Sequence, residues 1–359
     1  MHMTRPNIIL HRLINQQIAE SKFTKPGEIV SWLVAMQAQD FAMAKWAIGL
    51  RLPGSNEADI QKAFDEGTIL RTHLMRPTWH FITPADIRWL LALTAPRVNV
   101  VSAYYYRKCE LDAKVFKRSN QAITKALEGG KHLTRTSLKT ALERKKILTD
   151  VQRLSHIMLR AELDGVICSG PRQGRQFTYA LLEERVPATK ALDREEALAI
   201  FANRYFASRG PASIRDFVWW SGLGIREAKA GIAALGKEFT SEETDGTSYI
   251  FLPASLKNKE NLQSTFLMPD YDEYGISYKN RSALFDPKII TQERLLKNIG
   301  YRHILVINGV IAGTWSRIME KNVVVVETTP FKSLSKTKEK SVANAVKSYT
   351  CFLQDNHGK

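Results

Sequence analysis

Two glutamines flank a single alanine in an otherwise apolar stretch of the chain, at Gln37, Ala38 and Gln39. A glutamine side chain does not titrate, but its amide both donates and accepts hydrogen bonds. A two-residue spacing at the end of a helix can aim both amides into one cavity. Capping of the helix end by the same side chains is the simpler interpretation, and the residues by themselves leave both open.

A second polar group follows in residues 71–80, which read "RTHLMRPTWH". The pattern predicts two strands that meet at a turn. Alternation along the first strand places Arg71, His73 and Met75 on one face. On the second strand, Trp79 and His80 point to opposite faces.

This hairpin has a functional and a structural interpretation. In the functional one it forms a polar wall beside the glutamines, with Arg71 or Arg76 on a phosphate and Trp79 next to the site. His80 is then the group that titrates near neutral pH. In the structural one it is a packed hairpin with a core tryptophan.

Three carboxylates lie close together at Asp270, Asp272 and Glu273. The spacing lacks the glycine and the distal glutamate of a calcium loop, and no histidine lies nearby to complete a transition-metal site. We therefore predict a structural turn without a metal, in which Tyr274 or Tyr278 stacks. The sequence also contains no phosphate-binding loop, dinucleotide fingerprint, HExxH motif or nucleophile elbow, so no cofactor is expected.

The composition indicates a polyanionic partner. The chain has 359 residues, a net charge of +16 and 44% hydrophobic residues, which is enough for several cores. Nucleic acid is the first candidate partner and an anionic membrane surface the second. No apolar run is long enough to span a membrane. The three cysteines are widely spaced, which favours reduced thiols in a cytoplasmic protein.

The most basic segment, residues 131–190, has the order of a winged helix: helix, turn, helix, strand, basic turn, strand. Its elements are predicted at 133–147, 149–165, 166–170 and 176–182. A second helix of this kind enters the DNA major groove, and a hairpin wing contacts the backbone. Four arginines of this unit are predicted to meet phosphates: Arg153, Arg160, Arg172 and Arg175.

The same order of elements recurs twice, without clear sequence repetition. The predicted fold class is α+β, with tandem winged-helix units and a C-terminal, mainly β subdomain. The predicted units cover 1–110, with a helix over 25–37 and a connector helix over 84–107, then 111–190, 191–258 and 259–359. The third unit is slightly acidic, so a scaffold role is favoured at least as much as a contact with DNA. The chain ends in a helix predicted at 338–355.

Three stretches together resemble the AlkZ/YcaQ-type winged-helix DNA glycosylases, closest to the AlkZ-like branch. They are "MQAQDFAMAKWAIGLR" (36–51), "LRTHLMRPTWHFITPADIRWLL" (70–91) and "VINGVIAGTWSR" (306–317). The resemblance covers nearly the whole chain in the same order. It implies tandem winged helices around duplex DNA and excision of alkylated purines, including purines joined in interstrand crosslinks.

The resemblance also implies catalytic residues. The AlkZ-type motif is glutamine, an aliphatic residue and glutamine, which Gln37, Ala38 and Gln39 match. In the YcaQ branch the third residue is aspartate. Asp40 lies one position beyond that aspartate, so no catalytic role is assigned to it.

The chemistry of a glycosylase suits these residues. An N7- or N3-alkylated purine is cationic and leaves as a neutral base, while oxocarbenium character develops on the sugar. Two amides can hold a water molecule and supply partial negative charge. We therefore expect a monofunctional glycosylase. We also expect the protein to be a monomer in the cytoplasm, associated with the nucleoid. The alternative is a winged-helix transcription regulator without catalytic activity.

Overall fold

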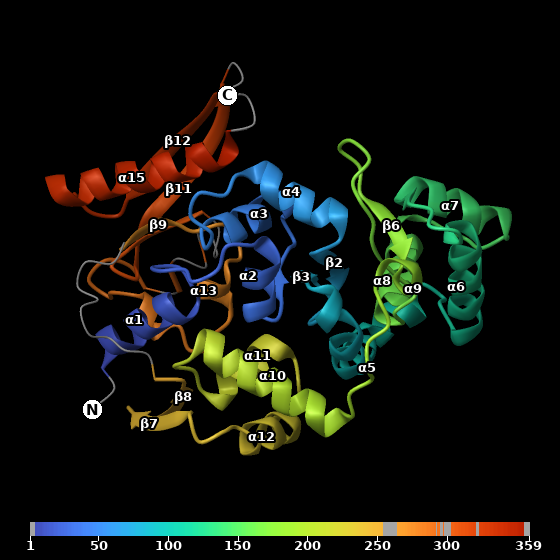
Figure 1. The fold of residues 1–359 in the computed structure, drawn as a ribbon, viewed down its shortest axis with the longest axis horizontal. Helices are drawn as coiled ribbons and strands as arrows, with labels where there is room; N and C mark the ends of the chain where they lie inside the picture. The colour runs from blue at the N-terminus through green and yellow to red at the C-terminus, as the bar shows by residue number, and fades with distance from the viewer. Residues whose placement is uncertain are drawn as a thin grey trace.

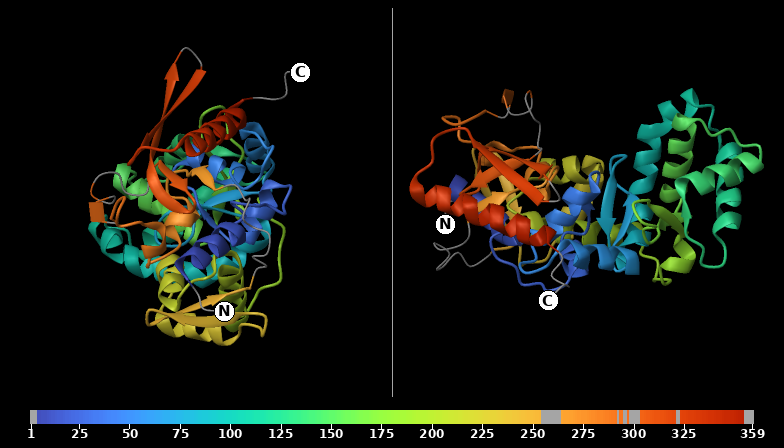
Figure 2. Two further views of the ribbon diagram at one scale, coloured as in Figure 1. Left: turned by 90° about the vertical axis from the view of Figure 1, so that its left-hand side faces the viewer. Right: turned by 90° about the horizontal axis from the view of Figure 1, so that it is seen from above.

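The structure is a computed structural model that describes residues 4–253, 264–291, 293–294, 297, 303–320 and 323–354. Three winged-helix units follow one another and lead into a C-terminal β unit (Figure 1). The predicted fold class is therefore confirmed. Figure 2 shows an elongated molecule in which the second unit lies at one end.

The first unit contains three helices and a three-stranded sheet of order β1-β3-β2. Its elements are α2 (Pro26–Trp32), β1 (Met36–Gln37), α3 (Phe41–Gly49), α4 (Glu57–Glu66), β2 (Leu70–His73) and β3 (Trp79–Ile82). The side chain of Asp40 caps α3 by accepting from the Met43 N–H at 3.0 Å. Gly67 ends α4 with a φ of 81°, a conformation that glycine adopts without steric cost.

The long helix α5 (Pro84–Lys108) leads into the second unit. This unit repeats the topology of the first, with a sheet of order β4-β6-β5. Its elements are α6 (Ala113–Leu127), β4 (Leu133–Thr134), α7 (Arg135–Arg144), α8 (Val151–Leu163), β5 (Ile167–Ser169), β6 (Thr178–Leu181) and α9 (Leu182–Arg185). Because most of its apolar residues form a cluster of their own, this unit stands apart from the rest of the molecule (Figure 1).

The third unit has the same plan with a reduced sheet. It consists of α10 (Arg194–Arg209), α11 (Ile214–Ser221), α12 (Ile225–Ala233), β7 (Thr240–Thr244) and β8 (Thr247–Phe251). A single bridge between Ala212 and Ile250 occupies the place that β1 and β4 hold in the other units. All three units thus have a very short strand between their first and second helices, paired with the last strand of the unit.

The C-terminal unit is a four-stranded sheet of order β12-β11-β10-β9. It consists of β9 (Thr265–Leu267), α13 (Glu273–Ile276), η1 (Ser282–Leu284), β10 (Ile304–Ile307), β11 (Val310–Glu320), β12 (Val323–Pro330) and α15 (Lys336–Leu353). The N-terminal helix α1 (Arg5–Asn15) packs against this unit. One hydrophobic cluster joins the first unit to β9, β10, β11 and α15, so the two ends of the chain form one body.

Most predicted helices are confirmed, including the connector helix and the C-terminal helix; Asp355 lies outside the described residues. The helix predicted over 25–37 is wrong, because α2 ends at Trp32. Val34 then adopts a left-handed conformation with a φ of 63°. The carbonyls of Leu33 and Ala35 accept hydrogen bonds from Arg209, so a residue far away in sequence draws this backbone away from helix.

Candidate active site

Gln37 lies on a short strand and Gln39 in the bend before α3. The capping interpretation is wrong, because Asp40 caps α3. Gln37 is the last residue of β1 and pairs with His80 of β3. The Ala38 N–H continues the pairing by donating to the Trp79 carbonyl at 2.7 Å. The strand ends at Gln37 and the backbone bends at Gln39, whose side-chain oxygen accepts from the Trp79 N–H at 3.5 Å.

The three residues of this segment differ in exposure. Gln37 is half-buried, Ala38 is fully buried and Gln39 is exposed. Ala38 packs in the hydrophobic cluster of the first unit, which explains why a small apolar residue stands between the amides. The segment therefore presents two amides of unequal solvent access from a backbone that is fixed on the β3 side.

Arg71 holds the carbonyl groups of the same segment. Its Nε donates to the Ala38 carbonyl at 2.9 Å, and its Nη2 donates to the Gln39 carbonyl at 3.4 Å. Its guanidinium carbon lies 4.3 Å from the centre of the Trp79 ring and 4.8 Å from that of Phe177. Burial lowers the pKa of Arg71 to about 10, so the group stays charged at neutral pH and supports the glutamine segment.

Trp79 is enclosed by two side chains of the neighbouring strand. The centre of its ring lies 4.2 Å from that of His73, and Arg71 lies over the same ring. His73 also pairs through Nδ1 with Glu162 of α8, whose side chain is 2% exposed. Met75 was predicted to share their face, but β2 ends at His73 and Met75 is fully buried in the core.

His80 is a neutral imidazole in this structure. Its ring is fully buried, and its Nδ1 lies 2.9 Å from the Thr78 carbonyl. Because a carbonyl only accepts, Nδ1 carries the proton and Nε2 carries the lone pair. Burial and the nearby Arg76 lower the pKa of His80 to about 3. The prediction that His80 titrates near neutral pH is therefore wrong.

The Nε2 of His80 is buried and has no hydrogen-bond partner among the described residues. Residues paired directly across two strands point to the same face, so His80 shares a face with Gln37. The sheet thus places an acceptor without a partner on the face from which the first glutamine projects.

Arg76 lies in the turn between β2 and β3, in a left-handed conformation with a φ of 44°. Its Nε and Nη2 atoms are buried and have no partner among the described residues, and burial lowers its pKa. It packs against Gly222 of the third unit, where an added Cβ would lie 3.7 Å from the Arg76 Cγ. Its predicted phosphate contact would therefore form at the junction of two units.

The two arginines predicted on the helix of the second unit are engaged within the protein. Arg153 donates to the carbonyls of Leu148 and Cys109, and its side chain is 11% exposed. Its predicted role on a phosphate is therefore not favoured by this geometry. Arg160 pairs with Asp164 at 2.7 Å but keeps 30% of its side chain exposed.

The two arginines of the wing differ in their surroundings. The guanidinium carbon of Arg172 lies 4.7 Å from the centre of the Phe177 ring and 5.3 Å from that of Phe41, so the wing packs next to the start of α3. Arg175 is exposed. Of the four predicted arginines, Arg175 has the most open approach to a phosphate.

The acidic cluster in the C-terminal unit forms separate interactions. Asp272 pairs with Arg51, and the carboxylate of Asp270 accepts from the His303 N–H at 2.8 Å. Glu273 accepts from the backbone N–H of Gln37 at 2.9 Å. Among the described residues, no three potential ligands gather as a metal site would require. Sequence reasoning missed the link from Glu273 to the glutamines, which are more than 230 residues away.

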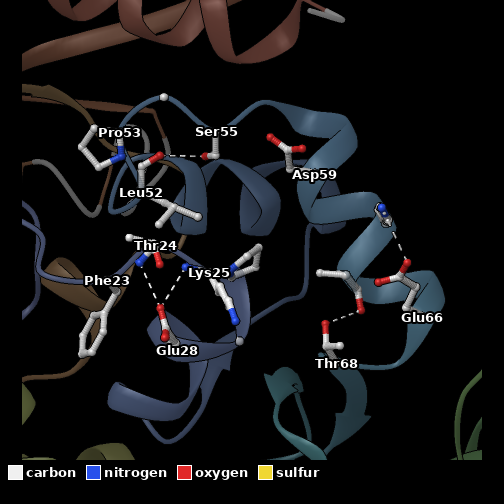
Figure 3. Close-up of a pocket in the computed structure, with 15 residues that line it drawn as sticks. Phe23, Thr24, Lys25, Glu28, Leu52, Pro53, Ser55, Asp59, Glu66 and Thr68 are labelled. Carbon is white, nitrogen blue, oxygen red and sulfur yellow. Dashed lines mark hydrogen bonds and ion pairs between the residues drawn. The ribbon is translucent and has the colours of Figure 1, made fainter. Parts of the chain in front are cut away.

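A cleft of about 730 Å³ lies elsewhere on the first unit, between the start of α2, the loop after α3 and α4 (Figure 3). Neither glutamine lines it. Glu28 accepts from the Thr24 and Lys25 N–H groups at 2.9 Å, and Asp59 accepts from the Asn56 N–H. These carboxylates close the starts of helices, so the cleft is a surface hollow rather than a reaction centre.

Comparison with known proteins decides the family. A family model described as "DNA glycosylase AlkZ-like" matches residues 30–352. The chain belongs to the AlkZ-like DNA glycosylase family. An interstrand DNA cross-link repair glycosylase from Streptomyces sahachiroi is 23% identical over 333 residues, which cover 88% of this chain and 87% of that relative.

The fold of an AlkZ-like glycosylase is also found by structural comparison. The solved structure of the Streptomyces sahachiroi DNA glycosylase AlkZ matches with a TM-score of 0.77 and 20% identity, covering 98% of this chain and 99% of that one. Membership of the AlkZ-like family favours a glycosylase over the transcription regulator that the sequence left open. None of the described helices has the combination of length and apolar character needed to cross a bilayer.

Proposed function

We propose that this AlkZ-like protein is a monofunctional glycosylase that hydrolyses the N-glycosidic bond of cationic N7- or N3-alkylated purines in duplex DNA. The observation that carries the proposal is the pair of amides at Gln37, on a strand paired with β3, and at Gln39, in the bend that follows it. An amide is a poor nucleophile, so water attacks the sugar and no covalent intermediate forms with the protein.

The proposed reaction needs little acid catalysis. As the bond between the base and C1′ breaks, its electron pair neutralises the positive charge of the alkylated purine. The oxygen of a water molecule bonds to C1′, and the water proton passes to solvent. The products are a neutral base and an abasic site.

The amides act where charge develops. Their carbonyl oxygens carry partial negative charge that stabilises the oxocarbenium-like sugar, and together they orient the water. Because neither amide is a strong base, the rate depends on the lability of the cationic substrate and on positioning.

The position of the site supports duplex DNA as the partner. Gln39 and Asp40 are exposed at the start of α3, and the wing of the second unit packs beside this point through Arg172. Together with the net charge of +16, this favours duplex DNA as the partner. We propose that the protein acts as a monomer in the cytoplasm, associated with the nucleoid. The proposed phosphate contacts come from Arg76, Arg160, Arg172 and Arg175.

The proposed substrates include purines joined in interstrand crosslinks. The Streptomyces sahachiroi relative is named for crosslink repair. A base tied to the opposite strand cannot swing freely out of the helix, as the substrates of many base-acting enzymes do. Two amides near the surface, one half-buried at Gln37 and one exposed at Gln39, are better suited to such a base than a deep pocket.

A labelled duplex with a single N7-methylguanine tests the proposal. Wild type, Gln37→Ala and Gln39→Ala would be incubated with it, and alkali would convert abasic sites into strand breaks. We expect cleavage by wild type that is reduced in both variants while DNA binding persists. Binding without cleavage of this duplex or of a crosslinked one would favour a regulator, and efficient excision of uracil would contradict the proposed charge logic.

A further inference from the structure

Among the described strands, the strand that carries Gln37 has a partner on one edge only. β3 pairs with that edge. On the other edge, two buried side chains form the hydrogen bonds that a strand would otherwise form. Arg209 of α10 donates from Nη1 to the Leu33 carbonyl at 2.9 Å and from Nη2 to the Ala35 carbonyl at 3.0 Å. Glu273 of α13 accepts from the Gln37 N–H at 2.9 Å.

The three bonded positions, Leu33, Ala35 and Gln37, are spaced two residues apart. For Ala35 and Gln37 this is the spacing of groups along one edge of an extended backbone. The turn at Val34, with its φ of 63°, lies between the first two of these bonds. A valine rarely adopts this conformation, so the surrounding contacts must hold it there.

Glu273 and Arg209 form one rigid group. Arg209 Nη2 lies 2.9 Å from Glu273 Oε2, with side-chain exposures of 0% and 1%. The same oxygen accepts from Ser277 Oγ at 2.6 Å and from Trp220 Nε1 at 2.8 Å. Burial by itself raises the pKa of Glu273, but Arg209 and these hydrogen bonds hold the pKa at about 2. The carboxylate is therefore charged at neutral pH.

The two oxygens of Glu273 have separate tasks. Oε2 accepts hydrogen bonds from Arg209, Ser277 and Trp220. Among the described residues, Oε1 accepts one hydrogen bond, from the Gln37 N–H. The guanidinium of Arg209 also lies 4.1 Å from the centre of the Trp220 ring. The third and C-terminal units thus fix a carboxylate oxygen at a defined place, and that oxygen fixes the first glutamine.

We propose that Glu273 and Arg209 are positioning residues of the glycosylase reaction, which set the register and orientation of Gln37 from the outer edge of its strand. The inference rests on the proposed function, because it assumes that Gln37 acts on the substrate. Displacement of a reacting group by about 1 Å can cost about 100-fold in rate. Loss of this anchor should therefore lower the rate of excision without removing any group that touches DNA.

A neighbouring ion pair provides a matched control. Asp272 accepts from Arg51 at 2.7 and 2.8 Å, with side-chain exposures of 2% and 0%. This pair is as buried as the first and begins at the adjacent residue of the chain. Arg51 also donates to Gln16 and to the Ala47 carbonyl, which lie outside the glutamine segment. Asp272 also caps α13 by accepting from the Tyr274 N–H at 2.8 Å. Asparagine keeps a capping oxygen, so Asp272→Asn reports the cost of breaking a buried ion pair while α13 stays capped.

A double-mutant cycle tests the proposal. Single-turnover excision of N7-methylguanine would be measured for wild type, Gln37→Ala, Glu273→Gln and the double variant, with Asp272→Asn as control. We expect Glu273→Gln to lower the rate constant by about 10- to 100-fold in the wild-type background, with DNA affinity within about threefold. In the Gln37→Ala background it should cost about twofold or less, because residues that act through one another are not additive.

The opposing outcomes are equally defined. An equal loss in both backgrounds, or a wild-type rate in Glu273→Gln, would overturn the proposal. If Asp272→Asn lowers the excision rate constant as much as Glu273→Gln does, the effect reflects loss of stability and not positioning of Gln37. Should Glu273→Gln not fold, Arg209→Lys takes its place in the cycle, since it keeps the charge but not the fork that reaches both carbonyls.

Amide hydrogen exchange separates this proposal from the proposed function. In Glu273→Gln we expect faster exchange at the Gln37 N–H, while the Ala38 N–H, bonded to Trp79, stays as protected as in wild type. If wild type excises nothing, the function fails while the exchange still tests the anchor. Unchanged protection of Gln37 in a folded variant would refute the anchor even if excision fell.

Discussion

Gln37 and His80 lie directly opposite each other in the antiparallel pair of β1 and β3, with their side chains on the same face. One is an amide that is half-open to solvent, and the other is a fully buried neutral imidazole. Neither of these two side chains is a base that titrates near neutral pH. Its chemistry therefore depends on hydrogen bonding and on where the backbone holds each group.

The first prediction concerns pH. The folded pKa of His80, about 3, lies below its ordinary value of 6.5, so between these values the unfolded chain binds a proton that the folded protein does not. Stability is therefore complete above pH 6.5 and declines as pH falls toward 3. Glu273, with a pKa lowered from 4.5 to about 2, adds a loss in the same direction below pH 4.5.

Urea unfolding at pH 8, 7, 6 and 5 measures this decline, and His80→Gln should show a shallower slope between pH 6.5 and 5. The excision rate of wild type should have no step near pH 6.5 that belongs to His80. A step there that disappears in His80→Gln would show that the imidazole titrates in the working enzyme, against our assignment.

The second prediction concerns Arg71. Arg71→Ala removes two hydrogen bonds to the glutamine segment and a guanidinium between Trp79 and Phe177. We expect a loss of about 2 kcal/mol in the free energy of unfolding and at least a tenfold slower excision. Lys22→Ala is the control, because Lys22 also lies over a ring, that of Trp32, but is neither a described partner of the glutamine segment nor a proposed phosphate contact. Equal rates for the two variants would contradict a role for Arg71 in the site.

The third prediction separates two arginines of the second unit. Arg175 is exposed on the wing, whereas Arg153 donates to backbone carbonyls. Arg175→Ala should weaken DNA binding at all sequences and reduce the slope of log affinity against log salt by about 0.9. Arg153→Ala should leave that slope unchanged and destabilise the fold by about 1–3 kcal/mol. Fluorescence anisotropy over a salt series measures the slope, and urea unfolding measures the stability. A reduced slope in Arg153→Ala and an unchanged slope in Arg175→Ala would contradict the prediction.

The fourth prediction concerns Asp40, which caps α3. Asp40→Ala should cost about 1 kcal/mol of stability, and Asp40→Asn should cost less because asparagine also caps well. Excision by both variants should stay within a few-fold of wild type. A loss of rate in Asp40→Asn as large as in Gln39→Ala would show that the carboxylate takes part in the chemistry.

Sequence patterns predicted the elements that depend on near neighbours. The glycine that ends α4 and the turn at Asp245 and Gly246 both follow from local conformational preference. The order of the winged helices also follows, because each unit has its own helical periodicity and turn residues. These features need no knowledge of distant contacts.

The conformation of residues 33–37 could not be predicted in this way. Apolar residues before Gln37 continue the helical pattern of α2, and the groups that override it, Arg209 and Glu273, lie far along the chain. The state of His80 was missed for a similar reason. Its burial results from packing of the first unit against others, and burial is what removes its charge.

Each of the three winged helices has a short strand between its first and second helices: Met36–Gln37, Leu133–Thr134 and the bridge at Ala212. Only the first of these is followed by a second amide two residues after a glutamine. A repeated scaffold can therefore gain an enzymatic role through side chains at one such connection. The other copies then maintain the fold and the binding of the substrate. Equivalent connections in other tandem winged-helix proteins are places where new catalysts could be built.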